Sequence, residues 1–168
     1  PLAVALLLAG DDPLLAVRAE LEQPADLEVD AHADVWLRFG SGLTAHVEAS
    51  WEAEAMVWDL QASSASGVVR ADLAPVVDLE HDGEPVPLPP TRPGVEVPQV
   101  DAFGFVDQLA EAVAVAGGAP VRCGAAFGRV VLDVVCAAYA SAGAGGTEVP
   151  LPFSGRRDRT PLELWRGR

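Results

Sequence analysis

The stretch ADVWLRFGSGLTAHVEASWE, residues 33–52, has the clearest structural pattern in the sequence. In its second half apolar and polar residues alternate: Leu43, Ala45, Val47, Ala49 and Trp51 against Thr44, His46, Glu48, Ser50 and Glu52. A period of two is typical of a strand with one buried face and one wet face. Gly40-Ser41-Gly42 separates this strand from Ala33–Phe39, so the stretch predicts an antiparallel hairpin. We expect the polar side, which carries His46 and Glu48, to face away from the core.

Further strands are predicted on both sides of this hairpin, at Leu14–Gln23, Met56–Ser63, Val68–Asp72 and Val76–Glu80, with a short last strand at Thr147–Leu151. In the second of these, Trp58 and Leu60 point to one face, and Asp59 and Gln61 point to the other. Because Trp51 and Trp58 alternate with apolar neighbours, we expect both indole rings to lie in the core.

Three long helices and one short helix complete the pattern. The long ones are predicted at Pro1–Gly10, Asp101–Ala116 and Gly124–Ala142. Thr160-Pro161-Leu162-Glu163 has the form of a capping box, which predicts a short helix through Trp165. Residues 84–98 contain six prolines and are predicted to be a loop. A run of strands followed by helices predicts an α+β fold, with a mostly antiparallel open sheet of about six strands and helices packed on one face.

The charge balance excludes several classes of function. The chain has 25 acidic and 11 basic residues, for a net charge of -14, and every basic residue is arginine. Binding to duplex nucleic acid or to anionic lipid needs a basic surface, so neither partner is expected. The absence of lysine removes Schiff-base chemistry and a P-loop lysine from this chain.

The cysteines and the apolar segments favour a cytoplasmic location. Cys123 and Cys136 are placed in one helix, where their separation of about 20 Å prevents a disulfide. The apolar run Leu2–Ala9 is shorter than the roughly 20 residues that cross a bilayer, and no basic segment precedes it. Since Pro1 already lies in this apolar run, we expect the chain to be a fragment of a longer protein.

The sequence contains no complete catalytic or metal-binding motif. Gly40-Ser41-Gly42-Leu43-Thr44-Ala45 matches a dinucleotide fingerprint, but a strand rather than a helix follows it, so a hairpin turn is favoured. His32, His46 and His81 have no metal-ligand spacing. Cys123 lies near a helix start, where a thiolate is favoured, but a packing role is the commoner one. Metal and nucleophile sites are therefore not expected.

Four stretches resemble one protein family, and they occur in the family's order. They are ADVWLRFGSGLTAHVEASW at Ala33–Trp51, WDLQASSASGVVRAD at Trp58–Asp72, FVDQLAEAV at Phe105–Val113 and AAYASAGAGGTEVPLP at Ala137–Pro152. Together they resemble the C-terminal domain of the Gfo/Idh/MocA oxidoreductases, the glucose-fructose oxidoreductase and inositol dehydrogenase group. The resemblance places this α+β domain at residues 1–153 and leaves 154–168 as a tail with a short helix.

The resemblance implies an enzyme of two domains, of which this chain is the second. An N-terminal Rossmann domain, absent from this chain, would bind NAD or NADP. The family's E-K-P and D-x-x-x-H motifs are also absent, so no catalytic or cofactor-binding residue is assigned here. The domain would shape the site for a sugar or polyol substrate and would form a homo-oligomer through the open sheet face, for which we name Thr44, His46, Glu48, Asp59 and Gln61.

Two alternatives remain open at the level of sequence. The chain could be a non-catalytic ligand-binding or dimerisation module of the same fold. It could also be an unrelated α+β enzyme that uses Cys123 or His46. The substrate and the choice between NAD and NADP are not encoded in this chain.

Overall fold

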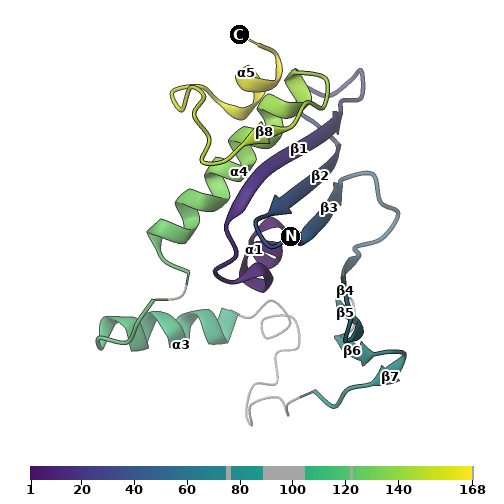
Figure 1. The fold of residues 1–168 in the computed structure, drawn as a ribbon, viewed down its shortest axis with the longest axis vertical. Coiled ribbons are helices and arrows are strands. Elements are labelled where there is room, and N and C mark those ends of the chain that lie inside the picture. The colour runs from purple at the N-terminus through teal and green to yellow at the C-terminus, as the bar shows by residue number, and fades with distance from the viewer. Residues whose placement is uncertain (75–76, 89–104, 122, 168) are drawn as a thin grey trace. The chain divides into compact units, whose positions relative to one another are not determined.

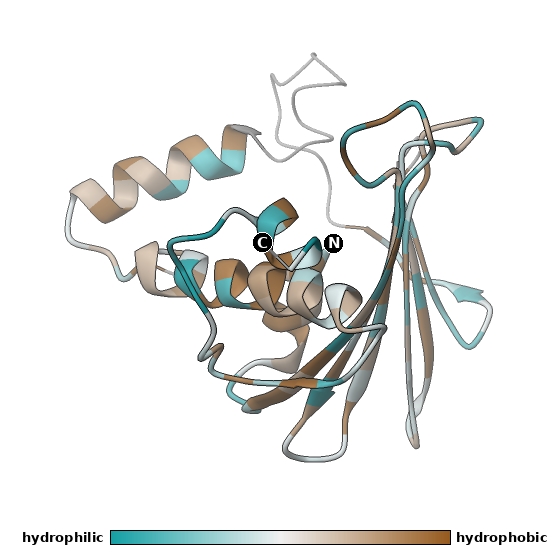
Figure 2. Cartoon of the chain, turned by 90° about the horizontal axis from the view of Figure 1, so that it is seen from above, coloured by the Kyte–Doolittle hydropathy of each residue, from teal (hydrophilic) through white to brown (hydrophobic). Residues whose placement is uncertain are grey.

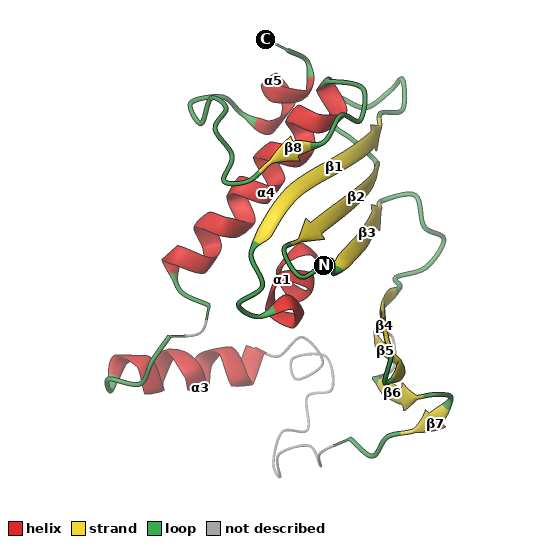
Figure 3. Ribbon diagram, in the orientation of Figure 1, coloured by secondary structure: helices red, strands yellow, loops and turns green. Residues whose placement is uncertain are grey.

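The computed structural model describes residues 1–74, 77–88, 105–121 and 123–167 (Figure 1). These residues divide into two compact units, Pro1–Glu52 with Arg122–Arg168, and Ala53–Val121. Each unit contains one antiparallel sheet of four strands together with helix (Figure 3).

The first unit contains sheet A, whose strands lie in the order β3-β2-β1-β8. The strands are β1 (Leu14–Glu22), β2 (His32–Phe39), β3 (Thr44–Ser50) and β8 (Val149–Pro150). Every neighbouring pair is antiparallel. Between β2 and β3 the Phe39 N–H donates to the Leu43 carbonyl at 2.9 Å, and Gly42 has a φ of 93° that favours glycine. The predicted hairpin is therefore confirmed.

Three helices belong to this unit: α1 (Leu2–Ala9), α4 (Ala125–Gly143) and α5 (Pro161–Trp165). Helix α4 lies along β1, and α1 contacts α4 and β3 (Figure 2). Helix α5 packs against α4 and begins with the predicted capping box, in which Thr160 and Glu163 satisfy each other's backbone N–H groups. A Cβ atom on Gly143 would lie only 2.5 Å from the Trp165 carbonyl oxygen, so a glycine permits this close approach.

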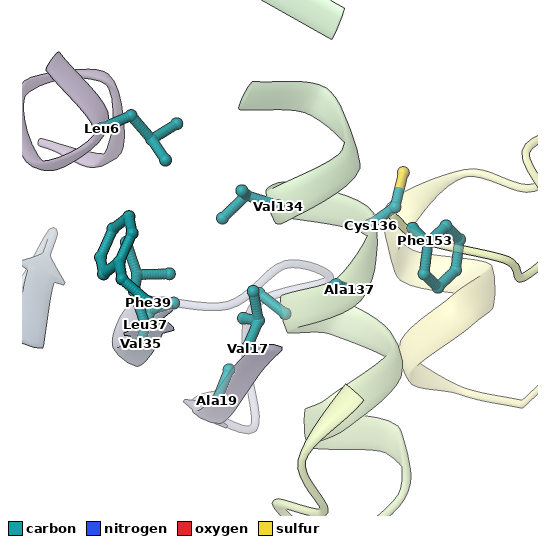
Figure 4. Packing of buried hydrophobic residues seen from close by; sticks show 11 residues of the cluster. Leu6, Val17, Ala19, Val35, Leu37, Phe39, Val134, Cys136, Ala137 and Phe153 are labelled. Carbon is teal, nitrogen blue, oxygen red and sulfur yellow. The ribbon is translucent and has the colours of Figure 1, made fainter. Parts of the chain in front are cut away.

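The core lies between α4 and the inner face of sheet A. Figure 4 shows side chains of β1, β2, α1 and α4 that converge there. The most buried members are Val17, Ala19, Val35, Leu37, Phe39, Val134, Ala137, Ala138 and Phe153. Alternate residues of β1 and β2 supply this face, as the period of two requires.

Ser141 ties α4 to the sheet through a fully buried hydroxyl group. Its Oγ accepts from the Ala19 N–H at 2.9 Å and donates to the Thr147 carbonyl at 2.7 Å. The side chain of Ser141 is 0% exposed. A hydroxyl that satisfies a strand donor in this way stabilises the fold mainly because the donor would otherwise be buried without a partner.

We expect Ser141→Ala to lower the free energy of unfolding by about 1–3 kcal/mol, because the Ala19 N–H and the Thr147 carbonyl would lose their partner. Urea denaturation followed by circular dichroism measures this change. Ser154→Ala, at an exposed position of the same unit, is the control and should change stability by less than about 0.5 kcal/mol. Equal stability of the two variants would contradict this role of Ser141.

The second unit contains sheet B, with strands in the order β4-β5-β6-β7. Its elements are β4 (Trp58–Ser64), β5 (Gly67–Ala74), β6 (Asp78–His81), β7 (Glu84–Pro85) and helix α3 (Phe105–Ala116). Along the start of β4 the half-buried Trp58 and Leu60 alternate with the exposed Asp59 and Gln61, as predicted. The expected helix start at residues 101–104 lies outside the described residues.

The α+β class and the antiparallel pairing are confirmed. The strands, however, are distributed over two sheets rather than one sheet of about six strands. Sheet A ends at Ser50 and sheet B begins at Trp58, so the segment between them separates the two ladders. One further strand, β7, lies inside the region that its prolines predicted to be a loop.

Two other expectations are corrected. Trp51 is 86% exposed and not in the core, because β3 ends at Ser50 and Trp51 lies beyond the ladder. Cys123 is not in the same helix as Cys136, because α4 begins at Ala125; Cys123 is exposed and Cys136 is buried, both as free thiols.

Helix α4 has the length and composition of a membrane-spanning helix. Part of its apolar surface has another role in this structure, because Val134, Ala137 and Ala138 pack in the core against sheet A. Burial also raises the pKa of the Cys136 thiol, which keeps it protonated and apolar.

Candidate functional site: the outer face of sheet A

The face of sheet A that lies opposite α4 carries two rows of functional side chains. We define the stack row as Arg18, Trp36 and His46, and the acidic row as Glu20, Asp34 and Glu48. In each row the three residues come from β1, β2 and β3 and are direct cross-strand partners. The rows are neighbours because their members are two residues apart along each strand. We call this surface the outer face.

Contacts with the Trp36 ring hold the stack row together. The Arg18 guanidinium lies over the Trp36 ring at 4.5 Å from its centroid. On the other side, the His46 ring is stacked on Trp36, with centroids 5.0 Å apart and an interplanar angle of 9°. Such contacts are worth about 0.5–1.5 kcal/mol each beyond the area that they bury. These contacts therefore fix the position of the half-buried Trp36 ring on the outer face.

Asp34, at the centre of the acidic row, contacts two histidines. Its Oδ1 lies 2.6 Å from His46 Nε2, and its Oδ2 lies 2.9 Å from His32 Nε2. Glu20 and Glu48 lie directly opposite Asp34 on the flanking strands. Like charges in direct cross-strand positions repel, and the hydrogen bonds of Asp34 with the two imidazoles oppose this repulsion.

The pKa values of this cluster follow from its contacts. Partial burial opposes ionisation of Asp34, but the hydrogen bonds with His46 and His32 outweigh it and hold the pKa of Asp34 below its ordinary 3.8. The hydrogen bond with Asp34 raises the pKa of His32 above 6.5, against a smaller effect of burial. The ionised carboxylate and the protonated imidazole therefore stabilise each other.

We expect this cluster to stabilise the fold most between about pH 4 and pH 6.5. The contribution of His32 is complete below 6.5 and is lost as the pH rises through its raised pKa. The contribution of Asp34 is present above 3.8 and is lost as the pH falls through its lowered pKa. For this part-buried pair, unfolding should cost about 0.5–1 kcal/mol more at about pH 5.5 than at about pH 8.

Urea denaturation at the two pH values measures this difference in stability. Asp34→Asn is the matched variant, since it removes the charge and keeps the shape of the side chain. If the free energy of unfolding has the same pH dependence in the wild type and in Asp34→Asn, the pH dependence does not come from Asp34 and His32.

Charged contacts also tie β8 to the sheet. Arg38 forms two hydrogen bonds with Glu148, at 3.2 and 2.6 Å, and Arg18 Nε donates to the Gly146 carbonyl at 3.1 Å. The hydrogen bonds with Arg38 lower the pKa of Glu148, so this carboxylate stays ionised beside β8. Arg18 also contacts Glu20 within the chain.

The structure places the predicted interface residues in both units. Thr44, His46 and Glu48 are exposed along β3, on the outer face of sheet A. Asp59 and Gln61 are exposed along β4 in sheet B. There Gln61 Oε1 accepts from Arg70 Nε at 3.0 Å, and Asp59 lies opposite Asp72.

Sequence reasoning found His46 and Glu48 but missed their partners Arg18, Asp34 and Trp36. Part of the signal was available: a short hairpin turn fixes the pairing of its two strands, and this pairing sets Trp36 opposite His46. The position of Arg18 opposite Trp36 depends on the irregular segment between β1 and β2, which gives no such signal.

The remaining candidates from the sequence are the metal ligands, the glycine motif and the clustered arginines. Among the described residues, no group of three or more His, Cys, Asp or Glu side chains could hold a metal ion. Gly40-Ser41-Gly42 forms the turn into β3, and no helix follows it. The clustered arginines at the C-terminal end pair with carboxylates, Arg156 with Asp158, Arg157 with Asp133, and Arg159 with Glu163.

Comparison with solved structures gives a consistent set of neighbours. Aldose-aldose oxidoreductase from Caulobacter crescentus, complexed with glycerol, aligns with a TM-score of 0.65 and 24% identity over 89% of this chain. WlbA dehydrogenase from Bordetella pertussis, in complex with NADH and UDP-GlcNAcA, aligns with a TM-score of 0.66 and 18% identity over 90% of this chain. Levoglucosan dehydrogenase, in complex with NADH and L-sorbose, aligns with a TM-score of 0.62 and 19% identity over 83%.

The chain has the fold of the Gfo/Idh/MocA oxidoreductases. The resemblance seen in the sequence is thus confirmed at the level of the fold. The chain spans 44–45% of the length of these three Gfo/Idh/MocA structures. No family model matches the sequence, and no curated protein matches it either.

Proposed function

We propose that residues 1–153 are the substrate-shaping and oligomerisation domain of an NAD(P)-dependent oxidoreductase that acts on a sugar, cyclitol or other polyol. One observation carries the proposal: the fold matches sugar-processing oxidoreductases over most of this chain but over less than half of theirs. Residues 154–168 then form a tail whose helix α5 packs on α4.

The cofactor is assigned to another part of the parent protein. Two of the neighbours above were solved with NADH, which supports NAD as the cofactor of the full-length enzyme. In this chain the glycine motif is a hairpin turn, so it lacks the helix N-terminus on which a pyrophosphate would rest. The proposed domain is therefore inactive by itself.

The oligomer is assigned to the outer face of sheet A, with Thr44, His46 and Glu48, and to Asp59 and Gln61 of sheet B. On each sheet these residues are exposed and alternate with more buried neighbours. A sheet that has helices on one side leaves its other side available, and two identical faces can meet around a two-fold axis.

Sedimentation equilibrium together with an NADH fluorescence titration tests both parts of this proposal. We expect a mass of twice 17.5 kDa at micromolar concentration and no NADH binding by this chain. A strict monomer would contradict the oligomerisation role, and NADH binding by the isolated chain would contradict the assignment of the cofactor to another domain. A parent protein that binds sugar without turning it over would favour the alternative, a non-catalytic module of the same fold.

A further inference from the structure

We propose that two copies of this chain pack outer face to outer face with their strands antiparallel, so that the stack row of each copy lies on the acidic row of the other. This inference rests on the proposed function, because it takes the dimer as given and derives its register. It assigns the partner's Glu20 to Arg18 and the partner's Glu48 to His46.

Symmetry leaves two simple ways to place one outer face on another. Two identical faces meet around a two-fold axis that lies in the plane between them. If the axis runs along the strands, β1 lies over β3 of the second copy. The stack row then faces the partner's stack row, and the acidic row faces the partner's acidic row. If the axis runs across the strands, midway between the two rows, each strand meets its own copy in the opposite direction. The stack row then lies on the acidic row.

The charges of the rows decide between these two arrangements. With the axis along the strands, Glu20 would face the partner's Glu48, and Asp34 would face the partner's Asp34. Three carboxylates from each copy would then oppose one another, in a chain whose net charge is already -14. Like charges that face each other across an interface cost several kcal/mol.

With the axis across the strands, each residue of the stack row meets a carboxylate of the partner's acidic row instead. Arg18 lies over the partner's Glu20, and His46 lies over the partner's Glu48. Trp36, whose ring contacts both Arg18 and His46, lies over the partner's Asp34. Arg18 and Glu20 pair with each other within one copy, but their side chains are still 46% and 57% exposed, so both can join a network with the partner's pair; Glu48 is also exposed on β3.

A charge-exchange experiment tests this register directly. Arg18→Glu alone places two glutamates at each of two symmetric contacts, and Glu20→Arg alone places two arginines there. We expect the dissociation constant of each homodimer to rise at least about tenfold. A mixture of the two variants restores opposite charges at both contacts. Native mass spectrometry and sedimentation should therefore show a heterodimer about as tight as the wild-type dimer.

A second pair of charge-exchange variants repeats the test at another contact, so that the result does not depend on the folding of one variant. His46→Glu and Glu48→Arg should show the same preference for each other, and circular dichroism should show that all four variants keep the wild-type fold. A wild-type dimer whose variants do not select each other would overturn the register alone. A tighter homodimer of Glu48→Arg would overturn it in favour of the axis along the strands. A monomeric wild type would overturn both this inference and the oligomerisation role.

Discussion

Leu37→Ala is expected to lower the free energy of unfolding by about 2–5 kcal/mol, which is among the largest effects that a single truncation has in a core. Leu37 is 1% exposed and belongs to the buried cluster between β1, β2 and α4, where it lies beside Phe39 (Figure 4). Removal of its isobutyl group loses the transfer free energy of the buried atoms and leaves a cavity that the sheet cannot close. Chemical denaturation followed by far-ultraviolet circular dichroism measures the loss.

Leu43→Ala is the matched control for this truncation. It removes the same atoms from a side chain that is 43% exposed, just before β3. Its cost should stay below about 1 kcal/mol. If both substitutions destabilise the protein equally, the core does not lie where the structure places it.

Trp36→Ala is expected to raise the dissociation constant of the proposed dimer by at least about 30-fold, because central tryptophans are typical hot spots of interfaces. The indole is held between Arg18 and His46 and is half-buried within one copy, so its remaining surface is presented to the second copy. Concentration-dependent sedimentation measures the dissociation constant.

Trp51→Ala is the control for this effect on association. Trp51 is 86% exposed and follows the last residue of β3, outside the stack row. Its removal should leave the dissociation constant within about threefold of the wild-type value, since peripheral residues contribute little to binding. An effect of Trp51→Ala as large as that of Trp36→Ala would show that the interface lies elsewhere.

The sequence predicted where the strands lie better than which residues pair across them. Alternation in Leu43–Glu52 identified β3 and its polar side, and the glycines identified the hairpin turn. Alternation assigns a face to each residue but not a cross-strand partner. The contacts of His46 with Asp34 and Trp36 therefore depended on a register that the periodicity alone does not give.

Tertiary context explains the remaining differences. Trp51 continues the alternation of its strand and its N–H donates to the Ala31 carbonyl, yet β2 begins at His32 and β3 ends at Ser50, so Trp51 lies just beyond the last paired residues and stays exposed. Prolines predicted a loop from residue 84, but Glu84–Pro85 still pairs with β6 at the edge of sheet B, where a missing N–H is tolerated. Local residue types do not encode where a ladder begins or ends.

The activity of the parent protein is the strongest test of the proposed role in an oxidoreductase. The proposed full-length parent would be assayed for NAD⁺ and NADP⁺ reduction with aldoses, cyclitols and nucleotide sugars, with this domain present or deleted. We predict turnover of at least one of these substrates, and its loss on deletion while NADH binding is retained. Turnover that survives deletion of this domain, or turnover by the isolated chain, would contradict the account.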